Sequence, residues 1–181
     1  MSDSLRQLLT PVDPSYELPL HDGWERIPAT DPRVADRLPQ GADALSSIEV
    51  VMMPAGGESP LALPILERRV RGENFGTLDA LVEERLADGA GSTLGDPAIL
   101  RHRARETAGD VDGYVVRYLL ATPGSGRRRG VEFLVAFPAL PDEKLQPLET
   151  LYDGIIASGS WRMPGGQVTA VPVSPPEPCW C

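Results

Sequence analysis

Two strongly apolar segments, residues 114–121 and 131–137, flank a loop that is rich in glycine and arginine. In an extended conformation both faces of each segment are apolar, apart from Arg117 and Glu132. Strands that are apolar on both faces lie in the interior of a sheet that is covered on both sides. The pattern therefore predicts a central β-hairpin with helical cover.

Two amphipathic stretches predict the main helices. Residues 78–88 form the first, with Thr77 as the N-cap and glycines after the end. Its apolar stripe consists of Leu78, Leu81, Val82 and Leu86. The second helix is expected to follow a turn at residues 143–146, because Pro147 is tolerated only near a helix start. Its predicted buried face consists of Leu148, Leu151, Tyr152, Ile155 and Ile156.

Shorter alternating patterns predict the remaining strands. Extended segments are expected at residues 16–20, 24–27, 47–53 and, less regularly, 61–70. In the third of these segments, alternation places Ile48, Val50 and Met52 on one face. One helical turn is expected at residues 34–38.

These elements predict a single α+β domain at residues 14–163, in which an antiparallel sheet is flanked by two main helices. Residues 1–13 would be an N-terminal extension with a short helix at residues 4–9. Residues 164–181 would be an extended tail, because this segment is rich in proline and lacks the apolar side chains of a packed core.

The bulk composition narrows the function classes. The chain has 181 residues, enough for one domain with a core, and its net charge of -9 argues against general nucleic-acid binding. Basic side chains are almost all arginine, with Lys144 as the one lysine, which is typical of a GC-rich, actinobacterial genome. We see no secretory signal and no run of about 20 apolar residues, and therefore expect a cytoplasmic protein without a membrane span.

Two short motifs carry a resemblance to a known family. The first is an extended strand that contains Pro19 and leads into Gly23-Trp24. The second, within residues 152–161, is a helix end that leads into an Ile-x-Ala-Ser sequence and a short apolar segment. Both resemble the start and the end of PsbP-like domains, and the helix at residues 78–88 and the apolar hairpin fall where that family has them.

The resemblance covers roughly residues 14–163 and implies an antiparallel sheet sandwiched by helices. The group includes PsbP, a yeast Ran-binding import factor, the bacterial protein DcrB and mycobacterial LpqN-type lipoproteins. It is mostly non-enzymatic and has no common catalytic residues, so the resemblance implies none here. Many bacterial members carry an export signal or a lipid-attachment cysteine, and we identify neither in this sequence.

The sequence offers little for catalysis. His21 and His102 are the only histidines, and no Gly-x-Ser-x-Gly motif is present. We expect His21 in a turn and His102 partly buried in a strand, and we expect neither an enzyme nor a cofactor. The alternative is an enzyme in which His102, arginine and carboxylate groups converge in a deep pocket.

Six arginines form the first candidate contact surface. A strand predicted at residues 97–107 places Arg101, Arg103 and Arg105 on one face, whereas Leu100, His102 and Ala104 occupy the other. The hairpin loop adds Arg127, Arg128 and Arg129 between glycines, as a phosphate cradle or as a solvated loop. If the strand lies near the loop, all six would form one patch for an acidic partner surface.

The C-terminal Cys179-Trp180-Cys181 is the second candidate site. Two thiolates half fill a site for Zn(II) or Cu(I), so a partner would have to complete it. The pair could instead form a local disulfide, receive a covalent modification, serve as a recognition peptide or have no role.

These observations predict a non-catalytic bacterial binding or adaptor protein, with a rigid sheet as platform and a protein partner with an acidic surface. The alternative is a carrier domain whose tail is modified or binds a soft metal at Cys179 and Cys181. The sequence predicts no oligomeric state.

Overall fold

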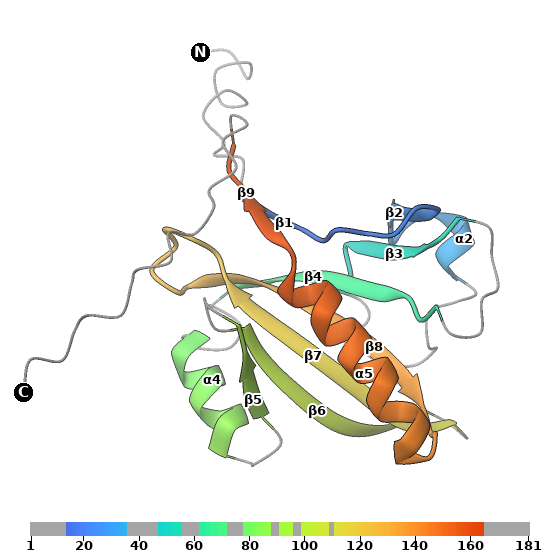
Figure 1. Cartoon of the computed structure of the whole chain (residues 1–181). Coiled ribbons are helices and arrows are strands. Elements are labelled where there is room, and N and C mark those ends of the chain that lie inside the picture. Colours follow the sequence, from blue (N-terminus) through green and yellow to red (C-terminus); the bar gives the residue numbers. More distant parts are fainter. Residues whose placement is uncertain are drawn as a thin grey trace, which may run out of the picture.

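The computed structural model describes residues 14–35, 47–55, 62–71, 78–87, 91–95, 99–108 and 111–164. Within these ranges the chain forms an α+β fold with two antiparallel sheets and three helices (Figure 1). The large sheet consists of β2 (Trp24–Pro28), β3 (Val50–Pro54), β4 (Ile65–Arg71), β5 (Gly91–Leu94), β6 (Ile99–Ala108), β7 (Val111–Ala121) and β8 (Arg129–Pro138). The small sheet consists of β1 (Ser15–Glu17) and β9 (Ser160–Arg162). The helices are α2 (Pro32–Ala35), α4 (Leu78–Ala87) and α5 (Asp142–Ala157).

The predicted apolar hairpin is confirmed as the centre of the large sheet. The seven strands follow the order β2-β3-β4-β8-β7-β6-β5, so that β8 and β7 both have a strand on each side. Their register places Tyr114 opposite Phe137 and Ala121 opposite Gly130. Side chains of both strands are buried on both faces, which explains why these strands lack a polar face.

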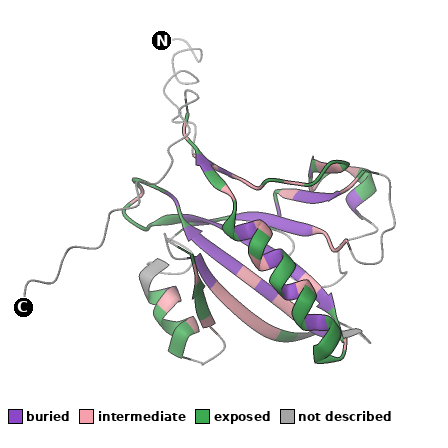
Figure 2. Ribbon diagram, in the orientation of Figure 1, coloured by how far each residue is buried: buried purple, intermediate pink, exposed green. Residues whose placement is uncertain are grey.

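Helix α5 covers one face of the sheet. Its buried residues are Leu145, Glu149, Tyr152 and Ile156. Figure 2 shows this helix lying across the sheet, with a large exposed part along its outer side. The ring of Tyr152 meets that of Phe137 edge to face at a centroid distance of 5.6 Å. The Tyr152 hydroxyl donates a hydrogen bond to the Leu63 carbonyl at 2.8 Å.

Two details of α5 differ from the sequence prediction. The helix already begins at Asp142, and Pro147 lies inside it, so the expected turn at residues 143–146 is wrong. Leu151, predicted to be buried, is 49% exposed. The buried positions recur every three or four residues from Leu145, and this stripe includes a carboxylate at Glu149 that a search for apolar residues overlooks.

The two shorter helices lie on the opposite face. Leu81 of α4 packs with Val70, Leu100 and Leu119. These three strand residues point away from α5, because successive side chains of a strand alternate between the two faces. Leu86 was expected in this contact but is 41% exposed. Helix α2 buries Val34 completely in a second cluster that also contains the following residues: Ile27, Ile48, Val51, Met53, Leu66 and Leu134.

The position of Ile48 corrects another prediction. It packs with Val51 and Met53, whereas Met52 belongs to the core under α5. The reason is that β3 begins only at Val50, so strand alternation does not extend back to Ile48.

The remaining sequence predictions have mixed outcomes. The strands near residues 24–27, 61–70 and 97–107 are confirmed as β2, β4 and β6. Strand β5 was not predicted, because Gly91 was interpreted as part of a helix stop. The helical turn lies at α2, earlier than expected. The helix expected at residues 4–9 and the proline-rich tail lie outside the described residues.

The small sheet joins the two ends of the described domain. Ser15 lies opposite Arg162, and Tyr16 lies opposite Trp161 with ring centroids 5.3 Å apart. The Tyr16 hydroxyl donates to the Ile156 carbonyl at 3.0 Å, which ties this sheet to the end of α5. None of the described helices has the length and apolar character needed to cross a membrane.

Candidate functional site

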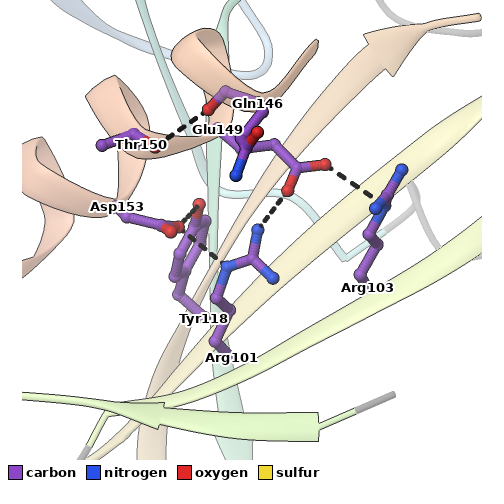
Figure 3. A network of polar contacts seen from close by, with 7 residues as sticks. All are labelled: Arg101, Arg103, Tyr118, Gln146, Glu149, Thr150 and Asp153. Carbon is purple, nitrogen blue, oxygen red and sulfur yellow. Dashed lines mark hydrogen bonds and ion pairs between the residues drawn. The ribbon is translucent and has the colours of Figure 1, made fainter. Parts of the chain in front are cut away.

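A polar network under α5 contains the first of the predicted arginines (Figure 3). Arg101 of β6 donates to the Glu149 carboxylate at 2.6 Å and to the Asp153 carboxylate at 2.9 Å. The Tyr118 hydroxyl also donates to Asp153, at 2.7 Å. Arg103 Nε lies 3.2 Å from the second Glu149 oxygen. The network therefore connects β6 and β7 to the helix above them.

Burial governs the electrostatics of this network. Burial raises the pKa of Tyr118 well above its usual range, and the hydrogen bond to Asp153 adds to the effect because ionisation would bring two anions together. Burial alone would lower the pKa of Arg101, but its bonds to Asp153 and Glu149 outweigh burial and raise it. Tyr118 is thus held neutral and Arg101 charged, and their contacts hold α5 on the sheet.

This placement argues against Arg101 as part of an open contact surface. The Arg101 side chain is 13% exposed and already engages two carboxylates. Arg103 lies 4.1 Å above the centre of the Tyr114 ring, in a cation–π contact. Arg105 is exposed, near the far end of β6.

A second buried network occupies the opposite face. The Glu132 carboxylate, 1% exposed, accepts a hydrogen bond from Arg68 Nε at 2.6 Å and one from Arg85 of α4 at 2.8 Å. Both arginines are themselves largely buried. Glu132 was the polar exception in the apolar strand pattern, and its role is to bind α4 to β4 and β8.

A third buried carboxylate, Glu67, lies on β4, the third strand from the β2 edge of the sheet. Arg26 donates from one nitrogen to both Glu67 oxygens, at 2.8 and 2.7 Å. Burial raises the pKa of Glu67, and the Arg26 charge opposes that change. The pair links β2 to β4 across β3. A raised pKa is also found at catalytic acids, but here burial accounts for the raised pKa, and the Glu67 carboxylate is already paired with Arg26.

A different set of arginines gathers where β4 ends and β8 begins. We call Arg69, Arg71, Arg127, Arg128 and Arg129 the hairpin basic cluster. Arg71 lies directly opposite Arg129, and Arg69 lies opposite Val131. Strand alternation therefore places Arg69, Arg71 and Arg129 on one face.

The cluster surrounds a small hollow. Its lining includes Arg69, Arg71 and Arg129, together with Thr122 and Pro14. The hollow has a volume of about 20 Å³, enough for a water-sized group, and it opens to solvent. Arg69 also forms an exposed ion pair with Glu49 at 3.3 Å, a kind of contact that contributes little free energy.

The hairpin loop next to this hollow is held by its own hydrogen bonds. The Thr122 amide donates to the Arg129 carbonyl at 2.8 Å, and the Ser125 hydroxyl donates to the Thr122 carbonyl at 2.7 Å. Gly124 and Gly126 have positive φ, as does Arg127 at 58°. A glycine-rich sequence is needed here because left-handed backbone is costly for most other residues.

The structure thus separates the six arginines predicted as one patch. Arg105 lies opposite Tyr114, seven residues along β7 from Ala121, where the hairpin loop begins. At about 3.3 Å per residue this places Arg105 roughly 23 Å from the loop. The loop arginines are joined instead by Arg69 and Arg71, which sequence analysis missed. The available signal was their alternation with Val70 at the end of a strand.

The other predicted site residues do not converge. His21 is exposed in the turn before β2, whereas His102 lies half-buried on β6, five strand positions further across the sheet. Among the described residues, no three histidine, cysteine or acidic side chains are grouped to hold a metal ion. Cys179 and Cys181 lie outside the described residues.

Comparisons with known proteins support the fold alone. No protein-family model matches the sequence, and no curated protein matches it. The structure is similar to the crystal structure of LpqN, which is involved in cell envelope biogenesis of Mycobacterium tuberculosis, with a TM-score of 0.50. The match covers 88% of this chain and 95% of LpqN at 15% identity. The chain therefore has an α+β fold related to that of LpqN.

Proposed function

We propose that this chain is a non-catalytic binding or adaptor protein of the PsbP-like type. In this proposal the large sheet is a rigid platform, and the hairpin basic cluster contacts an acidic surface on a partner protein. The fold likeness to LpqN supports membership of a PsbP-like sandwich group, and the cluster supports the location of the contact.

The observation that carries the proposal is that five arginines lie at one end of the paired strands β4 and β8 and in the loop next to it. Arg71 and Arg129 occupy facing positions of two paired strands, and the loop that carries Arg127 and Arg128 is internally hydrogen-bonded. Such side chains lose little backbone freedom on binding, which favours affinity. In a chain with a net charge of -9, a local positive surface steers an acidic partner to one place.

The test compares two single charge reversals. Arg128→Glu changes the hairpin basic cluster, and Lys144→Glu makes the same charge change at another exposed position, on α5. Proteins captured from an actinobacterial lysate by each variant are quantified by mass spectrometry. We expect a specific partner to be lost with Arg128→Glu and retained with Lys144→Glu, and its binding to weaken as salt is raised.

Two results would contradict this function. Equal capture by both variants would show that the cluster is not the contact surface. Conversion of a small-molecule substrate by the purified chain would show an enzyme instead.

A cytoplasmic location belongs to the same proposal, and the role of LpqN in the cell envelope offers the competing expectation for this chain. Fractionation of the native host, with a cytoplasmic and an envelope marker protein, distinguishes a cytoplasmic from an envelope location. Recovery with the envelope marker would redirect the search for a partner to envelope proteins.

A further inference from the structure

Helix α4 lies beside β5 and β6, on the face of the large sheet that α5 does not cover (Figure 1). Under this helix the strands contribute three apolar side chains, those of Val70, Leu100 and Leu119, each at most 3% exposed. We propose that α4 is a releasable cover, which opens as a unit while the sheet and α5 stay folded and thereby uncovers this apolar surface. The inference goes beyond the proposed function, because it involves none of the arginines of the hairpin basic cluster.

The apolar contact of α4 with the sheet is small. Among the side chains described at residues 80–87, that of Leu81 is buried, those of Val82 and Arg85 are partly buried, and the others are exposed. Even the apolar Leu86 is 41% exposed. Helices in proteins owe most of their stability to a packed apolar face, so a helix that buries so few apolar side chains is held weakly.

The charged contact of α4 can be broken without stranding a buried charge. Glu132 accepts from Arg85 of α4 through one oxygen, at 2.8 Å, and from Arg68 of β4 through the other, at 2.6 Å. When α4 leaves, Arg68 stays beside Glu132 because both belong to paired strands of the sheet. Opening therefore avoids an isolated buried carboxylate, which is the costly result of breaking most buried ion pairs, and it returns Arg85 to water.

The last turn of α4 lies directly against β5, at the edge of the sheet. A methyl group added at Gly91 would lie 2.6 Å from the Arg85 carbonyl oxygen, closer than a side-chain carbon approaches in proteins. The strand contributes no side chain at this contact, so the helix can leave without displacing one. The same contact offers a position at which the closed form can be disturbed from the strand side.

Helix α5 provides the comparison within the same protein. Its Leu145, Tyr152 and Ile156 are at most 1% exposed, and its Asp153 accepts a hydrogen bond from Arg101 of β6. Opening of α5 would uncover three large apolar side chains and remove the carboxylates that pair with Arg101. We therefore expect α5 to open only when the whole sheet unfolds, and α4 to open long before it.

Hydrogen exchange of the full chain, followed by NMR at increasing urea below the unfolding transition, tests the inference. The amides compared are those with acceptors inside each helix, at residues 82–87 and 148–157. We expect protection factors at least tenfold lower in α4 than in α5, and nearly independent of urea, because opening one helix exposes little surface. Equal protection of the two helices, or an equally steep urea dependence, would overturn the inference, since α4 would then open only by global unfolding.

Two substitutions disturb the closed form from different sides. Arg85→Gln removes the charge that contacts Glu132, and Gly91→Ala crowds the last turn of α4. Each should speed exchange at residues 82–87 at least tenfold and leave α5 unchanged, whereas Glu83→Gln, at an exposed position of α4, is the matched control and should change neither helix. Equal acceleration in both helices would overturn the inference. Circular dichroism confirms folding, and if a variant does not fold, the comparison of the two helices in the unchanged chain decides.

Discussion

Replacing Glu149 by glutamine tests whether the network under α5 holds the helix on the sheet. The Glu149 carboxylate accepts from Arg101 at 2.6 Å and lies 3.2 Å from Arg103 Nε, with its own side chain 12% exposed. Glutamine has nearly the same shape but carries no charge. It retains one acceptor oxygen and places an amide donor against the second arginine.

The expected loss follows from the two contacts. A hydrogen bond to a charged group contributes about 1.5–3 kcal/mol, and a neutral one about 0.5–1.5 kcal/mol, so the Arg101 contact loses roughly 1 kcal/mol. The Arg103 contact is an ion pair without hydrogen-bond geometry, and removing the Glu149 charge from it costs at most about 1 kcal/mol more. Arg101 keeps its bond to Asp153, which prevents the larger cost of an isolated buried charge. We expect Glu149→Gln to lower the free energy of unfolding by about 1–2 kcal/mol and the Tm by about 2–8 °C.

Urea unfolding monitored by circular dichroism gives the free energy, and calorimetry gives the Tm. Glu83→Gln, at an exposed position of α4, is the matched control and should change stability by less than about 0.5 kcal/mol. A double-mutant cycle of Glu149→Gln with Arg101→Gln should show a coupling of about 1 kcal/mol or more. A Glu149→Gln variant as stable as the control, or additive effects in the cycle, would refute this account.

Three further predictions are measured by the same unfolding assay. Ile156→Ala should cost about 2–5 kcal/mol because its side chain is fully buried, whereas Leu151→Ala should cost less than about 0.5 kcal/mol; the reverse order would restore the sequence-based helix face. Gly154→Ala should stabilise the protein by about 0.5–1 kcal/mol because its added methyl meets open space. Gly113→Ala should destabilise the protein because a methyl there lies 2.5 Å from a carbonyl oxygen of β8, and equal effects of the two substitutions would contradict that packing. Burial raises the pKa of Tyr152 to about 12, so between about pH 10 and 12 the folded state keeps a proton that the unfolded state loses. The free energy of unfolding therefore falls as pH rises through this window, and Tyr152→Phe should make that fall less steep. An unchanged slope would argue against the raised pKa.

The hairpin could be predicted from sequence because its signal is local. Residues 114–121 and 131–137 are adjacent in the chain and apolar on both faces, so their pairing and central position follow from pattern alone. The face of α5 was harder to predict. Glu149 is buried only because Arg101, 48 residues earlier, supplies its counter-charge, and a periodic search for apolar residues has no means to detect that partner.

The hairpin basic cluster shows the same limit. Arg127, Arg128 and Arg129 were recognisable as a local run, but Arg69 and Arg71 join them only through the pairing of β4 with β8. That pairing joins strands about 60 residues apart along the chain, and its register depends on the whole sheet. For Arg101 the long-range contact has the opposite effect. The alternating arginines of β6 predicted an exposed surface, but α5 covers Arg101 and supplies two carboxylates to it.

The pairing of β1 with β9 has an engineering consequence. Ser15 and Arg162 are directly opposed, so the two ends of the described domain lie next to each other. A chain with neighbouring ends tolerates insertion into a loop of a host protein and tolerates circular permutation. Because Pro14 also borders the arginine-lined hollow, a host protein that receives the domain as an insert would be attached beside the hairpin basic cluster.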